Sequence, residues 1–90
     1  MNQEPKVEPK ISIIIIHYNT PQYLETCINA ILNQSYANLE IIFIDNNSPD
    51  PSGLDFVAKN YEEDERVIIV PNEKNIGYAG AANQGIKMAI

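Results

Sequence analysis

The sequence predicts an α/β fold in which helices cover both faces of a parallel β-sheet. Two runs of apolar residues, 13–16 and 41–44, contain no polar alternation. Such runs indicate strands that are buried on both faces, as in a parallel sheet. Segments with helical spacing of apolar residues follow each expected strand, which gives the order β-α-β-α-β-α. This order predicts a three-layer α/β/α architecture.

Residues 11–16 are the first expected strand, because Ser12 is their only polar residue and β-branched isoleucine favours strands. Thr20 is the expected N-cap of the first helix, with Pro21 at the first helical position, where its missing N–H costs nothing. Five residues then share helical spacing and predict one stripe facing the sheet. The stripe comprises Leu24, Cys27, Ile28, Ile31 and Leu32, so Cys27 is expected in the core.

Residues 39–44 are the second expected strand, and a turn-rich loop over residues 46–53 follows it. A second helix is expected after this loop, with Asp50 or Ser52 as its cap. Its inner face should carry Leu54, Val57 and Tyr61.

Residues 66–70 are the third expected strand, with Pro71 stopping it. A loop over residues 72–77 leads to a third helix over residues 78–90. Small and apolar residues predict its inner face, namely Ala79, Ala82, Ile86 and Ala89.

Composition narrows the choice of function. The chain has 90 residues, one cysteine and a formal net charge of −6. This charge argues against nucleic acid as a partner, because phosphate binding needs clustered Lys and Arg. No apolar run approaches the roughly 20 residues of a membrane span. Residues 1–10 look like a flexible leader without a signal peptide, and a cytoplasmic location is the default for a single cysteine.

Asp45 stands directly after the second expected strand. Ligands bind at the carboxyl ends of the strands in open α/β sheets, so Asp45 is well placed to meet one. Asp45 could instead form the turn of its own loop. It could also be the phosphate acceptor of a receiver domain, but such domains need acids after the first strand to hold magnesium. Here that strand ends in His17-Tyr18-Asn19.

The glycines match no phosphate-binding motif. Gly80 and Gly85 have the spacing of a P-loop, but Ile86 and Lys87 occupy its Lys and Ser/Thr positions. Small residues here allow close approach to a neighbour or a ligand. His17 has no second histidine, cysteine or carboxylate near it in sequence. A structural role or a loose ligand contact therefore suits His17 better than a metal site.

Ordered sequence blocks resemble the start of a family 2 glycosyltransferase. The first strand ends in Ile13-Ile14-Ile15-Ile16-His17-Tyr18-Asn19, and the second region reads Leu39-Glu40-Ile41-Ile42-Phe43-Ile44-Asp45-Asn46-Asn47-Ser48. The third block reads Asn75-Ile76-Gly77-Tyr78-Ala79-Gly80-Ala81-Ala82-Asn83-Gln84-Gly85-Ile86. The resemblance covers residues 11–90 almost completely. It implies part of a Rossmann-like GT-A domain that binds a nucleotide-sugar donor.

The resemblance also implies roles for individual residues. In this family the tyrosine after the first strand packs near the nucleotide base, and the aspartate after the second strand accepts a hydrogen bond from the base edge. Those positions are Tyr18 and Asp45. The other expected donor-binding residues are Asn19, Asn47, Ser48, Gly77, Asn83 and Gly85. Ala82 replaces the arginine that the family's third block usually carries, which leaves the donor open.

The chemistry of the bases agrees with these roles. Stacking of a base on an aromatic ring contributes about 1–3 kcal/mol. A carboxylate that accepts an imide N–H forms a charge-assisted bond of about 1.5–3 kcal/mol. Uracil, thymine and guanine offer such an N–H, whereas adenine presents an acceptor.

The family's metal-binding Asp-x-Asp motif and its catalytic base stand beyond the third block. A divalent metal, Mg or Mn, is therefore expected in the full-length protein but not in this segment, which alone should transfer no sugar. The full-length protein is expected in the cytoplasm or at the inner membrane face, building glycans or polysaccharides by inverting transfer. Without a later strand beside it, residues 11–16 should form an apolar edge that promotes self-association. The alternative is a non-catalytic nucleotide-binding or interaction module with the same fold.

Overall fold

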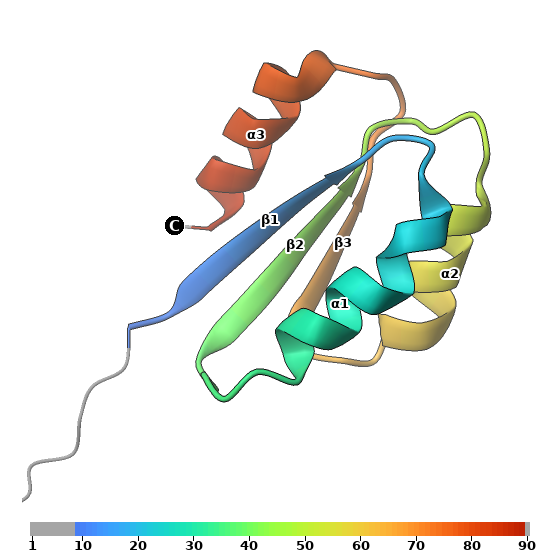
Figure 1. The fold of residues 1–90 in the computed structure, drawn as a ribbon. Coiled ribbons are helices and arrows are strands. Elements are labelled where there is room, and N and C mark those ends of the chain that lie inside the picture. Colours follow the sequence, from blue (N-terminus) through green and yellow to red (C-terminus); the bar gives the residue numbers. More distant parts are fainter. Residues whose placement is uncertain (1–8, 90) are drawn as a thin grey trace, which may run out of the picture.

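The computed structural model describes residues 9–89, and most of the predicted leader, residues 1–8, lies outside them. The described elements follow the predicted β-α-β-α-β-α order (Figure 1). They are β1 (Ile11–His17), a short 3-10 helix η1 (Pro21–Tyr23), α1 (Leu24–Leu32), β2 (Leu39–Asp45), α2 (Ser52–Tyr61), β3 (Val67–Pro71) and α3 (Gly77–Met88). The predicted α/β class is confirmed.

The strands form one parallel sheet in the order β1-β2-β3. Every residue of the central strand β2 is buried, which explains why residues 41–44 show no polar alternation. The register places His17 opposite Asp45 and Asp45 opposite Pro71. The three strands therefore end together, and the loops that leave them share one edge of the sheet (Figure 1).

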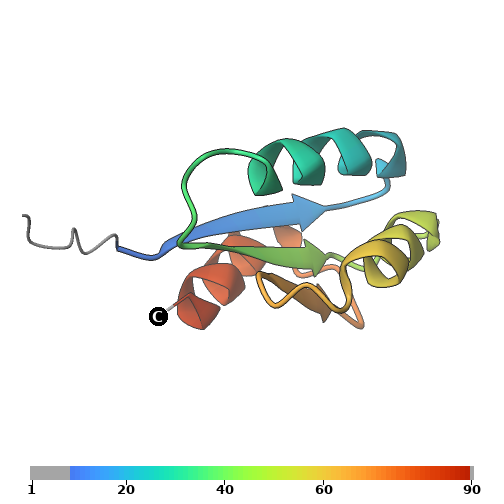
Figure 2. The same cartoon turned by 90° about the horizontal axis from the view of Figure 1, so that it is seen from below.

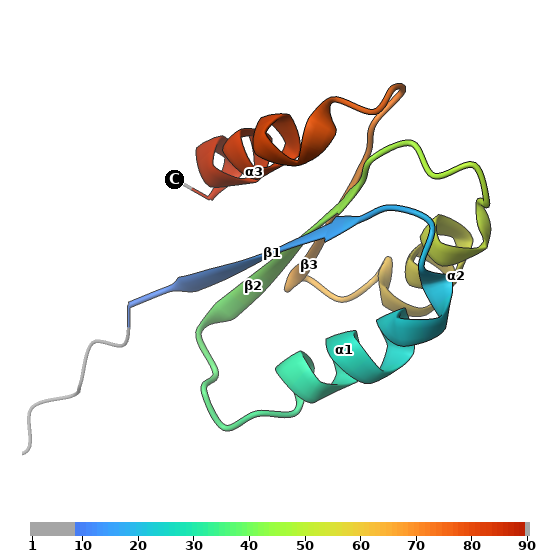
Figure 3. The ribbon, with the colours of Figure 1, turned by 45° about the horizontal axis from the view of Figure 1, so that its top comes forward.

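Helices cover both faces of this sheet. α1 and α2 lie on one face and α3 lies alone on the other (Figures 2 and 3). Ile41 and Phe43 belong to the core on the α1 and α2 side, whereas Ile42 and Ile44 pack with Ala81 of α3. Successive β2 side chains thus alternate between two apolar layers. The three-layer prediction is confirmed.

The predicted start and buried stripe of the first helix need correction. Thr20 makes no side-chain capping bond, and η1 precedes α1, although Pro21 does begin η1. Cys27 is exposed, so its placement in the core was wrong. Leu24 and Ile28, four residues apart, are the buried residues of α1. Cys27 lies about 100° around the helix from Ile28, so its side chain does not lie on the buried line through Leu24 and Ile28.

The buried face of α3 also differs from the prediction. Ala81 and Gly85 are its buried residues, whereas Ala79 is exposed and Ile86 is 54% exposed. Ala89 packs against the core on this side, as expected. A Cβ added at Gly85 would lie 2.7 Å from Cγ2 of Ile14 in β1. Close approach of the helix backbone therefore selects the smallest residues for this face, and a hydrophobic pattern does not report that requirement.

β1 is an edge strand among the described residues, since β2 is its only strand neighbour there. An edge strand can pair its outer backbone groups with another strand, so self-association through residues 11–16 stays a prediction. Sedimentation should show an average mass that rises with protein concentration. Ile11→Lys, at a residue that is 44% exposed, should weaken this rise by placing a charge on the edge. A monomer mass at every concentration would rule the prediction out.

Candidate functional site

Hydrogen bonds join the loop after β1 to the loop after β2. The N–H of Asn19 donates to Oγ of Ser48 at 2.9 Å, and the Ser48 hydroxyl donates to Oδ1 of Asp45 at 2.8 Å. The N–H of Asp50 donates to Oδ1 of Asn19 at 3.1 Å. The structure thus brings together Asn19, Asp45 and Ser48, three of the residues predicted to form one site.

Asp45 is 4% exposed and forms the turn of its own loop. Besides the hydroxyl bond to Oδ1, the N–H of Ser48 donates to Oδ2 at 3.2 Å. The turn-forming alternative for Asp45 is therefore present in the structure. Each carboxylate oxygen has two lone pairs, so these bonds leave acceptor capacity on Asp45.

Two asparagines at this edge have left-handed backbones. Asn19 has φ 58° and Asn47 has φ 60°. Non-glycine residues seldom adopt this region, although asparagine tolerates it better than most. Such conformations cost free energy and cluster at functional sites. The two positions follow β1 and β2 respectively, where the sequence predicted ligand contacts.

Tyr18 and Asn47 supply the exposed part of this edge. Tyr18 is 48% exposed, although the residue before it, His17, is buried. Asn47 is also exposed, next to the half-buried Ser48. An exposed aromatic ring can stack on a flat heterocycle.

Asn46 is a residue of this edge whose structural role the sequence interpretation missed. It is 3% exposed and holds the loop between β3 and α3. Its Oδ1 accepts the N–H of Ile76 at 3.0 Å, and its Nδ2 donates to the carbonyl of Gly77 at 3.3 Å. Gly77 is thereby fixed at the same edge. Alternation along β2 could have predicted this, because Asn46 continues the face of Ile42 and Ile44 that α3 covers.

α3 is fixed by a second pair of amides. Nδ2 of Asn72 donates to Oε1 of Gln84 at 3.0 Å, and Nε2 of Gln84 donates back to Oδ1 of Asn72 at 2.8 Å. The other predicted site residues of α3 lie elsewhere on it. Asn83 is exposed, and Gly85 packs on Ile14 within β1 rather than at the strand ends.

Asp50 stabilises the start of α2. Its Oδ1 accepts the N–H of Ser52 at 2.9 Å, so Asp50 satisfies a free amide at the helix N-terminus. This backbone bond is the main reason that the pKa of the Asp50 carboxyl lies below its usual value. The N-cap position itself belongs to Pro51, so the prediction that Asp50 or Ser52 is the N-cap was wrong.

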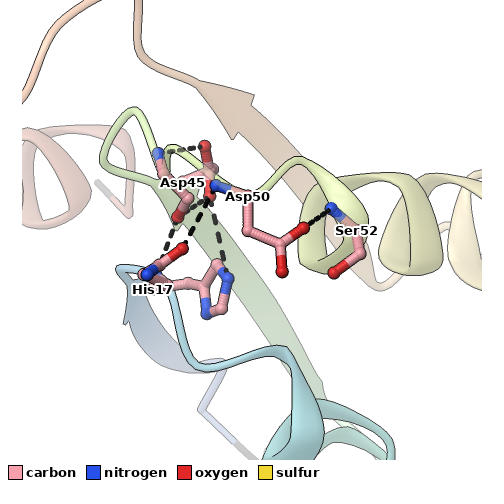
Figure 4. A network of polar contacts seen from close by, with 6 residues as sticks. His17, Asp45, Asp50 and Ser52 are labelled. Atoms are coloured by element: carbon pink, nitrogen blue, oxygen red, sulfur yellow. Dashed lines mark hydrogen bonds and ion pairs between the residues drawn. The ribbon is translucent and has the colours of Figure 1, made fainter.

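His17 lies between the sheet and α2 and points toward Asp45 (Figure 4). Its ring stacks on Phe43 with ring centroids 5.6 Å apart, and it is 2% exposed. Burial lowers the pKa of His17, and the nearby carboxylates of Asp45 and Asp50 offset only part of that effect. His17 is therefore neutral at neutral pH.

This shift predicts a pH dependence of folding stability. The unfolded chain binds a proton at His17 near pH 6.5, whereas the folded chain binds it only at lower pH. The contribution of neutral His17 to the free energy of unfolding should be complete well above pH 6.5 and should be lost as the pH falls below that value. Urea titrations at several pH values measure this. His17→Phe should flatten the slope, since this chain has one histidine. An unchanged slope in that variant would contradict the assignment.

The described part of the chain offers neither a cluster of metal ligands nor a helix that could span a membrane. No group of three or more His, Cys, Asp or Glu side chains there could hold a metal ion. None of the described helices is long and apolar enough to cross a membrane.

The chain combines a parallel α/β fold with polar residues at the ends of β1 and β2, namely Asn19, Asp45 and Ser48. Comparison with known proteins identifies the class of protein that has this combination. The family model described as Glycosyl transferase family 2 matches residues 12–90. The chain therefore belongs to glycosyltransferase family 2.

Relatives of this chain bear glycosyltransferase names. It is 37% identical over 78 residues to an uncharacterized glycosyltransferase of Haemophilus influenzae, covering 87% of this chain and 24% of that protein. It is 40% identical over 79 residues to glycosyltransferase GlyG of Streptococcus pneumoniae, covering 88% and 26%. A putative teichuronic acid biosynthesis glycosyltransferase of Bacillus subtilis, TuaG, is 35% identical over 83 residues, covering 91% and 32%. The chain thus spans between 24% and 32% of these relatives' lengths.

A solved structure shares the fold. A mannosyltransferase from Pyrobaculum calidifontis, in complex with GDP-Man and Mn2+, superposes with a TM-score of 0.79 at 24% identity. The match covers 97% of this chain and 26% of that one. The Rossmann-like arrangement of a GT-A domain, expected from the sequence blocks, is confirmed.

Proposed function

We propose that this chain binds the nucleotide part of a nucleotide-sugar donor for an inverting glycosyltransferase that builds a glycan or polysaccharide. The observation that carries the proposal is the placement of Asp45. It ends the fully buried central strand, it accepts hydrogen bonds from Ser48, and Ser48 in turn accepts one from the N–H of Asn19. Tyr18, in the adjoining loop, offers an exposed ring. Family membership supports the same role.

The base is the part of the donor that this edge suits best. The Tyr18 ring would stack on the base face, and an Asp45 oxygen would accept its imide or amide N–H. Uracil, thymine and guanine fit this acceptor, and adenine does not. Asn19, Asn47, Ser48 and Gly77 are proposed to line the remainder of the nucleotide site. Asn83 is proposed as an outer contact on α3, and Gly85 as the residue that lets α3 approach β1.

Sugar transfer requires more than this segment provides. The described residues do not fit a divalent metal, since no suitable cluster of ligands is present among them. The neighbour from Pyrobaculum calidifontis is described with Mn2+. We therefore propose that the full-length protein uses Mg2+ or Mn2+ held by residues outside this segment. The 90-residue chain alone is proposed to bind a donor without transferring its sugar.

Calorimetric titration with UDP, dTDP, GDP and ADP tests the proposal. At least one of the first three should bind more tightly than ADP. Asp45→Ala should weaken that binding by about 10- to 150-fold, the equivalent of a charge-assisted bond. Asp55→Ala, which removes an exposed carboxylate from α2, is the matched control and should leave the affinity unchanged.

A non-catalytic interaction module is the second candidate. It is favoured by the satisfied state of Asp45, whose two oxygens both accept hydrogen bonds from Ser48. Such a module would bind none of the four nucleotides. No detectable binding in all four titrations would therefore contradict the donor-binding proposal and support the interaction module.

A further inference from the structure

His17 has a buried nitrogen without a hydrogen-bond partner. Nε2 is the one buried side-chain nitrogen or oxygen among the described residues that lacks such a partner. An unpaired polar atom in the interior costs free energy, so native structures seldom keep one without a functional reason. The nearest carboxylate oxygen, Oδ1 of Asp45, lies 3.9 Å away, which is beyond hydrogen-bond range.

The packing around the ring holds Nε2 in this position. The ring stacks on Phe43, and Gly53 of α2 lies close to its Nε2 and Cε1 atoms. A Cβ at Gly53 would overlap Nε2 and lie 3.0 Å from Cε1 of His17. Only glycine leaves room for the imidazole at this point. The ring is therefore kept beside Asp45 by two separate elements, β2 and α2.

The hydrogen bonds of Asp45 show what an additional donor would do. Oδ1 accepts the Ser48 hydroxyl at 2.8 Å, and Oδ2 accepts the Ser48 N–H over the longer distance of 3.2 Å. A base N–H that binds Asp45 would compete most readily with the longer bond. Turning the carboxylate toward the base would then require a donor that keeps Oδ1 in place.

We propose that His17 is a positioning residue for Asp45, and that its Nε2–H closes onto Oδ1 when a nucleotide base engages the carboxylate. In this arrangement His17 and the Ser48 hydroxyl both donate to Oδ1, while Oδ2 faces the base. An ionised carboxylate can only accept, and the His17 contact keeps one of its oxygens turned toward the base. His17 thereby increases the preference for bases that present an N–H over adenine. This inference rests on the proposed donor-binding function.

Two variants separate the nitrogen from the ring. His17→Phe keeps an aromatic ring against Phe43 and removes Nε2. His17→Gln loses the ring but places an amide N–H near the position of Nε2. Affinity for the preferred nucleotide should fall by about 10-fold in His17→Phe, with a smaller ratio of its affinity to that of ADP. His17→Gln should restore most of both, which a purely structural role of the ring would not allow.

Nuclear magnetic resonance can follow the Nε2–H proton of His17 directly in the wild-type chain. The Nε2–H proton of His17 should move downfield and exchange more slowly with water when UDP or GDP is added. An unchanged signal in a nucleotide-saturated sample would overturn the proposal.

The outcomes of these experiments distinguish the role of His17 from the proposed donor-binding function. If the wild-type chain binds no nucleotide, or Asp45→Ala binds as well as the wild type, both proposals fall. If Asp45→Ala loses binding but His17→Phe keeps the wild-type affinity and base preference, the donor-binding function stands and the role of His17 is overturned.

Discussion

Replacing Phe43 by alanine is expected to lower the free energy of unfolding by about 3–5 kcal/mol. Phe43 is 0% exposed in the central strand, where it joins the core that α1 and α2 cover. Its ring also stacks on His17, with the centroids 5.6 Å apart. The substitution would leave a cavity at the middle of a small domain, whose stability depends on few buried side chains.

Urea denaturation of the purified variant measures this effect. Tyr23→Ala is the matched control, because Tyr23 is 67% exposed in η1 and its loss should change stability by no more than about 0.5 kcal/mol. If Phe43→Ala were destabilised as little as Tyr23→Ala, the core of the α1 and α2 side would not be where the structure places it.

Asn46→Ala is expected to lower the free energy of unfolding by about 1–3 kcal/mol and to release the loop before α3. The variant loses the acceptor for the Ile76 N–H and the donor to the Gly77 carbonyl. The amide of Asn46 is the side-chain link between the end of β2 and this loop. The β3–α3 loop should therefore move independently of the sheet in the variant.

Hydrogen exchange provides the local readout. The Ile76 amide should exchange faster in Asn46→Ala, while amides of β2 change only in proportion to global stability. Asn60→Ala, which removes an exposed amide from α2, is the control for a lost asparagine. If the Ile76 amide kept its wild-type protection in Asn46→Ala, the hydrogen bonds of Asn46 would not be what holds this loop.

Much of the fold could be predicted because burial on both faces leaves a direct trace in the sequence. Residues 41–44 are apolar without alternation, and the structure buries both their odd and their even members. The end of that run at Asp45 located the carboxyl edge of the sheet. Helix and strand order followed from spacing alone, and the element ends moved by one to three residues, the most at the start of α1, which η1 precedes.

The helix faces were less predictable, since they depend on how closely a helix approaches its neighbour. Cys27 fits an apolar stripe but lies beside the line of contact, and Ala79 fits as well as Ala81 until the packing on β1 is known. For a related reason, Asn46 was missed, and His17 was predicted only to have a structural role or a loose ligand contact. Their importance comes from contacts with α2 and with the loop before α3, which sequence spacing does not encode.

The central claim is that Asp45 accepts a hydrogen bond from a nucleotide base. A crystal structure of the chain with UDP, and a second with GDP, tests it most directly. A base N–H donor is expected about 2.7–3.2 Å from an Asp45 oxygen, with the Tyr18 ring against the base. A base bound elsewhere, with Asp45 still bonded to Ser48 alone, would contradict it.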